Sequence, residues 1–207
     1  MLVESGWEVL DPEPPDGSSI FLGRFEQDLG SDCAAALELI QESGPEVFGG
    51  SLLGPSTRTI RGSVGGEIGV RHHPTSALLQ RAGIGDADCM AIDLEEMVDG
   101  HGRQLPVFTD LTSAVTAAEQ LVEAIQQWGM PFVHDHASPD AMIAFISDGQ
   151  WTTRIESTPG LLATALLITT GHPDQAQASL SSFRAKVPKE FLENHDAGAA
   201  ALMNQIG

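Results

Sequence analysis

The chain has 207 residues and a mass of 21.9 kDa, which fits one domain or one domain with a small appendage. Hydrophobic residues make up 42% of it, enough to bury a core, and its formal net charge of −19 argues against general binding to nucleic acid, whose phosphates attract positive charge. The sequence has no apolar run of about 18 residues, so it predicts no membrane span. Acids and prolines in Met1–Asp16 are unlike a signal peptide, so we expect a cytoplasmic protein.

The two cysteines, Cys33 and Cys89, lie far apart in the sequence. Neither belongs to a Cys-x-x-Cys motif, and two isolated cysteines do not make a disulfide framework. We therefore expect both to be buried thiols that pack as small apolar side chains.

The acidic residues are unevenly distributed. They dominate residues 1–50 and 83–150, whereas residues 51–82 carry more arginines than acids and the tail is nearly neutral. This change predicts an acidic domain over residues 1–150 and a helical tail over 151–207. Two interpretations of the acidity remain open: a solvated surface adapted to the host, and a face that docks a basic partner through complementary charge.

The first third of the chain predicts strands and one helix. Alternation predicts strands at Gly6–Leu10 and Ser19–Phe25 around the turn-rich Asp11–Gly17. Ser31 resembles an N-cap, so Cys33–Glu42 is expected to be a helix. A strand is expected at Val47–Leu53.

The middle of the chain predicts a hairpin, a short helix and two further strands. The hairpin would join Thr57–Ser63 to Glu67–His72 through Val64–Gly66, because glycine tolerates positive φ. Pro74–Ala82 is typical of a short helix with proline in its first turn. The strands are expected at Asp88–Leu94 and Gln104–Phe108.

Helices are expected from Thr109 onward. Thr109–Trp128 has an apolar stripe at helical spacing and is expected to end at Gly129; the stripe comprises Leu111, Val115, Ala118, Val122 and Ile125. Ser138–Asp140 is a capped helix start with Gly149 as terminator. In the tail, Leu161–Thr170 and Pro173–Val187 predict a helical hairpin, and Glu190–Ile206 predicts a last helix, interrupted near Gly198. The whole pattern predicts an α+β fold: an antiparallel sheet packed against one long amphipathic helix, with an all-helical C-terminal tail.

Motifs for catalysis or cofactor binding are missing: there is no G-x-S-x-G, no phosphate loop and no dinucleotide fingerprint. We therefore expect neither catalytic residues nor a cofactor. His134 and His136 are weak metal candidates, because an H-x-H on a strand points both imidazoles to one face; the alternative is a pair of loop histidines. His72 and His73, next to Arg71, could bind an anion or could simply end a polar strand.

Two stretches resemble known families. Leu161–Pro188 is similar to one tetratricopeptide unit, and we interpret it as a generic helical hairpin. Pro106–Gly149, with Gln127–Val133 between a long and a short helix, resembles small bacterial immunity-type proteins made beside a toxin. That resemblance implies an α+β domain with a helical tail and no catalytic residue, with Trp128 and Phe132 in the core.

The net negative charge, the lack of catalytic motifs and the resemblance to immunity-type proteins together predict a non-enzymatic protein-binding module, such as an immunity-type inhibitor of a basic toxin. The expected partner-binding residues are acidic: Asp86, Asp88, Asp93, Glu95, Glu96 and Asp99. One alternative is a metal-binding or enzymatic domain that uses His134, His136 and dispersed carboxylates. Another is a scaffold that self-associates through its helical tail.

Overall fold

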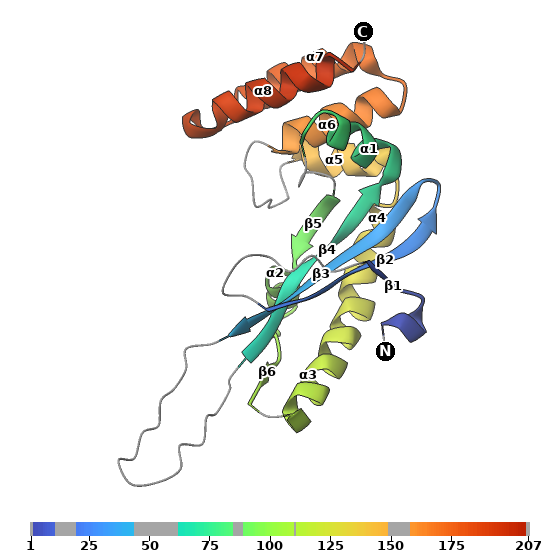
Figure 1. The fold of residues 1–207 in the computed structure, drawn as a ribbon, viewed down its shortest axis with the longest axis vertical. Helices are drawn as coiled ribbons and strands as arrows, with labels where there is room; N and C mark the ends of the chain where they lie inside the picture. Colours follow the sequence, from blue (N-terminus) through green and yellow to red (C-terminus); the bar gives the residue numbers. More distant parts are fainter. Residues whose placement is uncertain are drawn as a thin grey trace. The chain divides into compact units, whose positions relative to one another are not determined.

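A computed structural model of the chain describes residues 2–10, 20–43, 62–84, 89–109, 111–148 and 158–205. It confirms the predicted α+β class with an antiparallel sheet (Figure 1). The strands lie in the order β1-β2-β3-β4-β5, and β6 also pairs with β4. Their bounds are β1 Glu8–Leu10, β2 Ile20–Gly30, β3 Cys33–Ser43, β4 Gly62–His72, β5 Cys89–Asp93 and β6 Val107–Phe108.

Helices fill most of the remaining described chain. The α-helices are α1 His73–Arg81, α2 Leu94–Asp99, α3 Leu111–Ala124, α4 Met130–Asp135, α5 Pro139–Asp148, α6 Thr158–Thr169, α7 Pro173–Arg184 and α8 Leu192–Met203. A π-helical turn, Ile125–Gly129, joins α3 to α4, and short 3-10 turns cover Val3–Ser5 and Lys189–Phe191. No helix among the described residues is both long enough and apolar enough to span a bilayer.

Contacts between residues group the chain into two compact units. Unit 1 comprises Met1–Gln27, Leu37–Ile68 and Asp93–Pro131, and unit 2 comprises Asp28–Ala36, Gly69–Ile92 and Phe132–Gly207. The predicted division at residue 150 stays a prediction, because residues 149–157 lie outside the described part.

The predicted helix at Cys33–Glu42 is wrong, because this segment is strand β3. Ser31 and Asp32 have φ of 54° and 61°, which is the geometry of a two-residue hairpin connection and not of an N-cap. Apolar side chains at every second position from Cys33 are buried: Cys33, Ala35, Leu37 and Leu39. Burial at these positions therefore follows the strand period of two and not the helical spacing on which the prediction depended.

The predicted hairpin at Val64–Gly66 is also wrong. Residues 62–72 form one continuous strand, and the expected Thr57–Arg61 half lies outside the described residues. Gly66 has a positive φ of 138°, and a Cβ there would overlap the Glu38 carbonyl oxygen of β3. Gly66 is thus explained by close contact between neighbouring strands, not by a turn.

Several predicted elements are confirmed. Glu8–Leu10, Ile20–Gly30 and Cys89–Asp93 are strands, and α1 has a proline in its first turn and Gly83 behind it with φ of 74°. Strand β6 is shorter than expected. The Ser138 Oγ caps α5 by accepting a hydrogen bond from the Ala141 N–H at 3.2 Å. The expected turn at 11–17, strand at 47–53 and terminator Gly149 lie outside the described residues.

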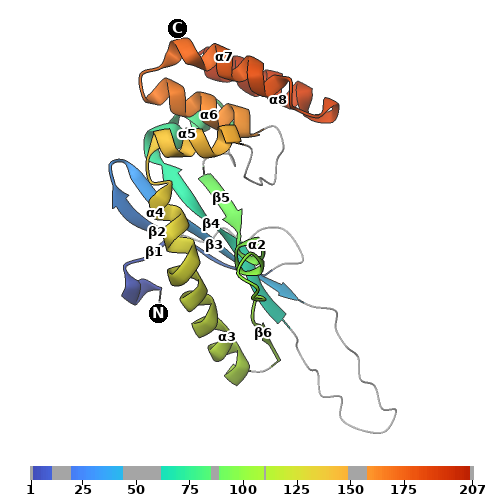
Figure 2. The same cartoon turned by 180° about the vertical axis from the view of Figure 1, so that it is seen from behind.

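In unit 1 the long helix is confirmed but its end is not. Gly129 does not stop it, since α3 continues through the π-turn into α4 (Figure 2). In the π-turn the Met130 N–H donates to the Ile125 carbonyl. The buried side shares Ile125 with the predicted stripe but otherwise differs from it: Val115 is 57% exposed, and the other buried positions are Ala117, Leu121 and Ala124. Gly129 fits there because a Cβ would meet the Ile68 side chain of β4 at 2.7 Å.

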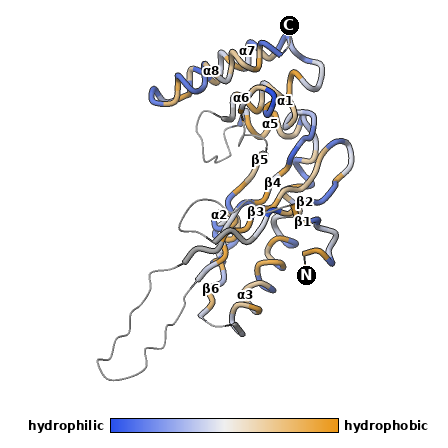
Figure 3. Tube along the Cα trace, viewed as in Figure 1, coloured by the Kyte–Doolittle hydropathy of each residue, from blue (hydrophilic) through white to orange (hydrophobic). Residues whose placement is uncertain are grey.

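In unit 2 the helix α6 forms the centre of the packing. It is apolar along its length, Leu161–Leu167 are all buried, and α1, α5, α7 and α8 pack around it (Figure 3). This confirms a helical hairpin plus one more helix in the tail. Gly198 does not interrupt α8. It lies against Leu161 and Ile84, where a larger side chain would clash, so close packing explains the glycine.

Candidate functional site

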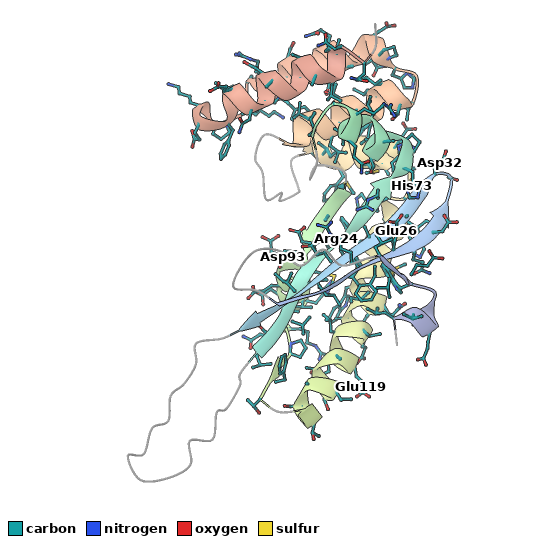
Figure 4. The ribbon with its side chains drawn as sticks, viewed as in Figure 1. Arg24, Glu26, Asp32, His73, Asp93 and Glu119 are labelled. Carbon is teal, nitrogen blue, oxygen red and sulfur yellow. The ribbon has the colours of Figure 1, made fainter. Side chains whose placement is uncertain are left out.

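The acidic segment after β5 contains a helix start as well as exposed carboxylates. Asp93 is the N-cap of α2: its Oδ1 accepts hydrogen bonds from the Glu95 N–H at 2.6 Å and the Glu96 N–H at 3.3 Å (Figure 4). An N-cap acceptor satisfies amide groups that the first turn leaves unpaired. Asp93 therefore has a structural role, beside whatever it contributes to binding.

The other described acids of this segment lie on the outer side of α2. Glu95, Glu96 and Asp99 are exposed, whereas Leu94, Met97 and Val98 are buried beneath them. Packing on one side thus fixes α2 and keeps the three carboxylates on the side that faces solvent. Asp86 and Asp88 lie outside the described residues.

An aromatic pair lies next to this helix. His101, just after α2, is exposed and stacks on Trp128 of the π-turn, with ring centroids 4.7 Å apart and planes 11° apart. The π-turn packs against α2, and the Met97 sulfur lies close to Gly129. Trp128 is half-buried, so the expectation that it belongs to the core is wrong, and so is that for the half-buried Phe132.

We call Glu95, Glu96, Asp99, His101 and Trp128 the acidic–aromatic face. Its carboxylates were predictable from the sequence, whereas His101 was not, because no motif marks a histidine that stacks only after folding. Helical π-turns are rare and occur frequently at functional sites, and here the π-turn contains Trp128.

The field around this face is negative. Among the described side chains of unit 1 the cations are Arg24 and Arg103, and Arg24 Nε already bonds to Glu38 Oε2 at 3.1 Å. The strand register places Glu8 opposite Glu26, so like charges meet across β1 and β2. Other acids described in unit 1 are Glu4, Glu67, Glu119 and Glu123.

The candidate metal ligand His134 lies in the last turn of helix α4, Met130–Asp135, and His136 follows the helix directly, so neither lies on a strand. The His136 N–H still donates to the Phe132 carbonyl as in a helical turn, and positions two apart in such a turn point about 200° from each other, so the pair does not share a face. His136 Nδ1 donates to the Phe132 carbonyl at 2.7 Å, and its ring contacts those of Phe132 and Phe145. Within the ranges that the structure describes, no three His, Cys, Asp or Glu residues gather as a metal site would require.

His72, one of the two histidines considered for an anion, is buried in unit 2. Its Nδ1 lies 2.8 Å from Thr75 Oγ1, which lies 2.8 Å from Thr169 Oγ1. Because the Thr169 hydroxyl donates to the Ala165 carbonyl at 2.9 Å, Thr75 donates to Thr169 and accepts from the His72 Nδ1–H. Burial lowers the pKa of His72 from its ordinary value of 6.5, and nearby His73 lowers it further. The negative charge of Asp32 acts in the opposite direction and raises this pKa, but burial is the larger effect.

His195 on α8 is the most deeply buried histidine in the described chain and was not singled out from sequence. It is 1% exposed, and neither ring nitrogen has a hydrogen-bond partner. Nδ1 lies 3.5 Å from the Asp196 Oδ1, and a Cβ on Gly160 of α6 would lie 3.4 Å from Nε2. Each unpaired buried polar atom costs about 1–3 kcal/mol, so this side chain needs an explanation beyond packing.

Comparisons with protein-family models, curated proteins and solved structures find no match to this chain.

Proposed function

We propose that this protein is a non-enzymatic protein-binding module whose acidic–aromatic face docks on a basic protein. One observation supports the proposal above others: the exposed carboxylates Glu95, Glu96 and Asp99 lie beside an exposed histidine stacked on Trp128. Tryptophan is enriched among the residues that dominate binding energy, and charged groups at an interface rim set association rate and partner choice.

The proposed partner is a basic toxin, such as a nuclease, that the protein inhibits by covering its active site. The net charge of −19 favours a strongly basic partner, because opposite charge speeds the encounter of two proteins. Inhibition then depends on slow dissociation, which a buried aromatic anchor provides.

The first experiment identifies the partner. The full chain is tagged, expressed in its own host and purified at low salt, and co-purifying proteins are identified by mass spectrometry over a series of salt washes. We expect one stoichiometric basic protein that is lost at high salt. Absence of any basic partner at low salt would contradict the proposal.

The second experiment locates the interface by charge reversal. The double variant Glu95→Lys/Glu96→Lys should lower the association rate with the partner about tenfold at low salt. Asp93 is left intact, because its loss would remove the N-cap of α2. The matched control is Glu190→Lys/Glu193→Lys, which changes net charge equally on exposed residues of unit 2. Equal slowing by both double variants would show that only overall charge matters.

A third measurement separates the aromatic pair from the charges. Trp128→Ala should raise the dissociation rate and cost about 2 kcal/mol of binding, near 30-fold in Kd, with little effect on association. Trp128→Phe keeps a ring against His101 and should lose much less. An unchanged dissociation rate in Trp128→Ala would remove the aromatic pair from the interface.

A further inference from the structure

A groove of about 330 Å³ lies between α7 and α8 in unit 2. That volume is at the lower end of the range for small-molecule sites. Polar groups of Gln177, Ser181, Arg184 and Asp196 line it together with the apolar side chains of Leu180 and Met203. The buried His195, which has no hydrogen-bond partner, also lines it.

Arg184 and Asp196 form a bidentate pair in the groove. Arg184 Nε donates to Asp196 Oδ1 at 2.7 Å, and Nη2 donates to Oδ2 at 2.8 Å. Neither bond uses Nη1, which therefore keeps two N–H groups for another acceptor. The pair fixes the guanidinium, so a ligand that binds Nη1 meets a donor already held in position.

The unused donors point to an anionic ligand. Arg184, Lys186 and Lys189 are balanced over residues 184–196 by Glu190, Glu193 and Asp196, so the ligand is recognised by the Arg184 Nη1 group and the unpartnered imidazole and not by local net charge. Asp196 lies in the same groove and repels a dianion more strongly than a monoanion. A single carboxylate therefore fits better than a phosphate, and Leu180 and Met203 suit an apolar body attached to it.

We propose that the α7–α8 groove binds a small monocarboxylate with an apolar body, held by Arg184 Nη1 and by the imidazole of His195. Both ring nitrogens of His195 are covered by protein atoms, so binding shifts the ring toward the carboxylate. The Nδ1 lies 3.5 Å from Asp196 Oδ1 and neither ring nitrogen has a hydrogen-bond partner, so no hydrogen bond of the ring is broken by this shift. The ligand supplies the acceptor that the buried imidazole lacks.

The test uses the full chain and two probes, benzoate and hexanoate, followed by NMR of the Arg184 Nε–H and the His195 ring nitrogens. We expect saturable shifts at millimolar probe, with both signals moving together. Benzyl alcohol and inorganic phosphate serve as the neutral and dianionic comparisons, and we expect neither to give these shifts.

Two variants locate the site without disturbing the core. Ala199→Leu fills the groove, and Arg184→Gln removes the donor; each should weaken probe binding at least tenfold. Their controls are Ala197→Leu, exposed on the same helix, and Arg81→Gln, exposed on α1, which should bind like the unchanged chain. Circular dichroism checks that each variant folds.

Three results would overturn the proposal. The first is the absence of saturable shifts with either carboxylate up to its solubility. The second is undiminished binding by Ala199→Leu. The third is equal binding of benzyl alcohol or phosphate, which would make the groove an apolar slot or a general anion site.

Discussion

Replacing Gly66 by alanine tests the close approach of β3 and β4. A Cβ at Gly66 would overlap the Glu38 carbonyl oxygen and lie 3.1 Å from the Leu39 Cα, so β3 must move away from β4. The φ of 138° adds strain of about 1–3 kcal/mol for a residue with a side chain. Separation of the strands also weakens their hydrogen bonds, each worth about 1 kcal/mol. We expect a loss of about 3–5 kcal/mol in the free energy of unfolding.

Gly102→Ala is the matched control in the same unit. Gly102 also has a positive φ, 69°, but nothing lies within 4 Å of its added Cβ, so only the backbone strain of about 1–2 kcal/mol is expected. Urea unfolding followed by tryptophan fluorescence compares the two, since Trp7 is 1% exposed in unit 1. Gly66→Ala should lower the midpoint by roughly 1 M more than the control. Equal midpoints would refute the close approach of β3 and β4.

Two further predictions concern hydrogen-bonded side chains. Asp93→Ala should cost about 1 kcal/mol of stability, whereas Asp93→Asn keeps an oxygen acceptor and should cost less; equal losses in urea unfolding would argue against the cap. His72 should titrate below 6.5 by NMR and carry its proton on Nδ1 when neutral. An unfolded histidine binds a proton near pH 6.5, whereas folded His72 binds one only at lower pH. The contribution of His72 to the free energy of unfolding is therefore greatest above pH 6.5 and falls as the pH drops toward the lower pKa of the folded state. Titration above 6.5 would contradict the burial argument.

The helical half of the fold was predictable because its signals are local. Each signal lies within its own helix, and the structure confirms all three helices: Pro74 in α1, Ser138 before α5 and the apolar run Leu161–Leu167 in α6. The cap at Asp93 was not predicted, because the sequence pattern places Asp93 near the end of an expected strand and among the partner-binding acids.

The errors in the sheet have a different origin. Cys33–Ser43 satisfies a helical spacing and a strand spacing at once, and only pairing with β2 and β4 decides between them. Gly66 could be a turn residue or a point of close approach, and the choice depends on where the Glu38 carbonyl lies. The His101–Trp128 stack joins residues 27 positions apart, so it had no local signal either.

The π-turn at Ile125–Gly129 has a consequence for the evolution of this chain. A π-turn holds one residue more than a regular helical turn, so it is equivalent to a single-residue insertion within an established helix. Deleting that residue would leave an unbroken helix but rotate everything beyond it by about 100°. A chain that keeps the turn keeps Trp128 opposite His101 and Gly129 against Ile68, whereas one with a regular helix would have one residue fewer there and would present a different residue to His101.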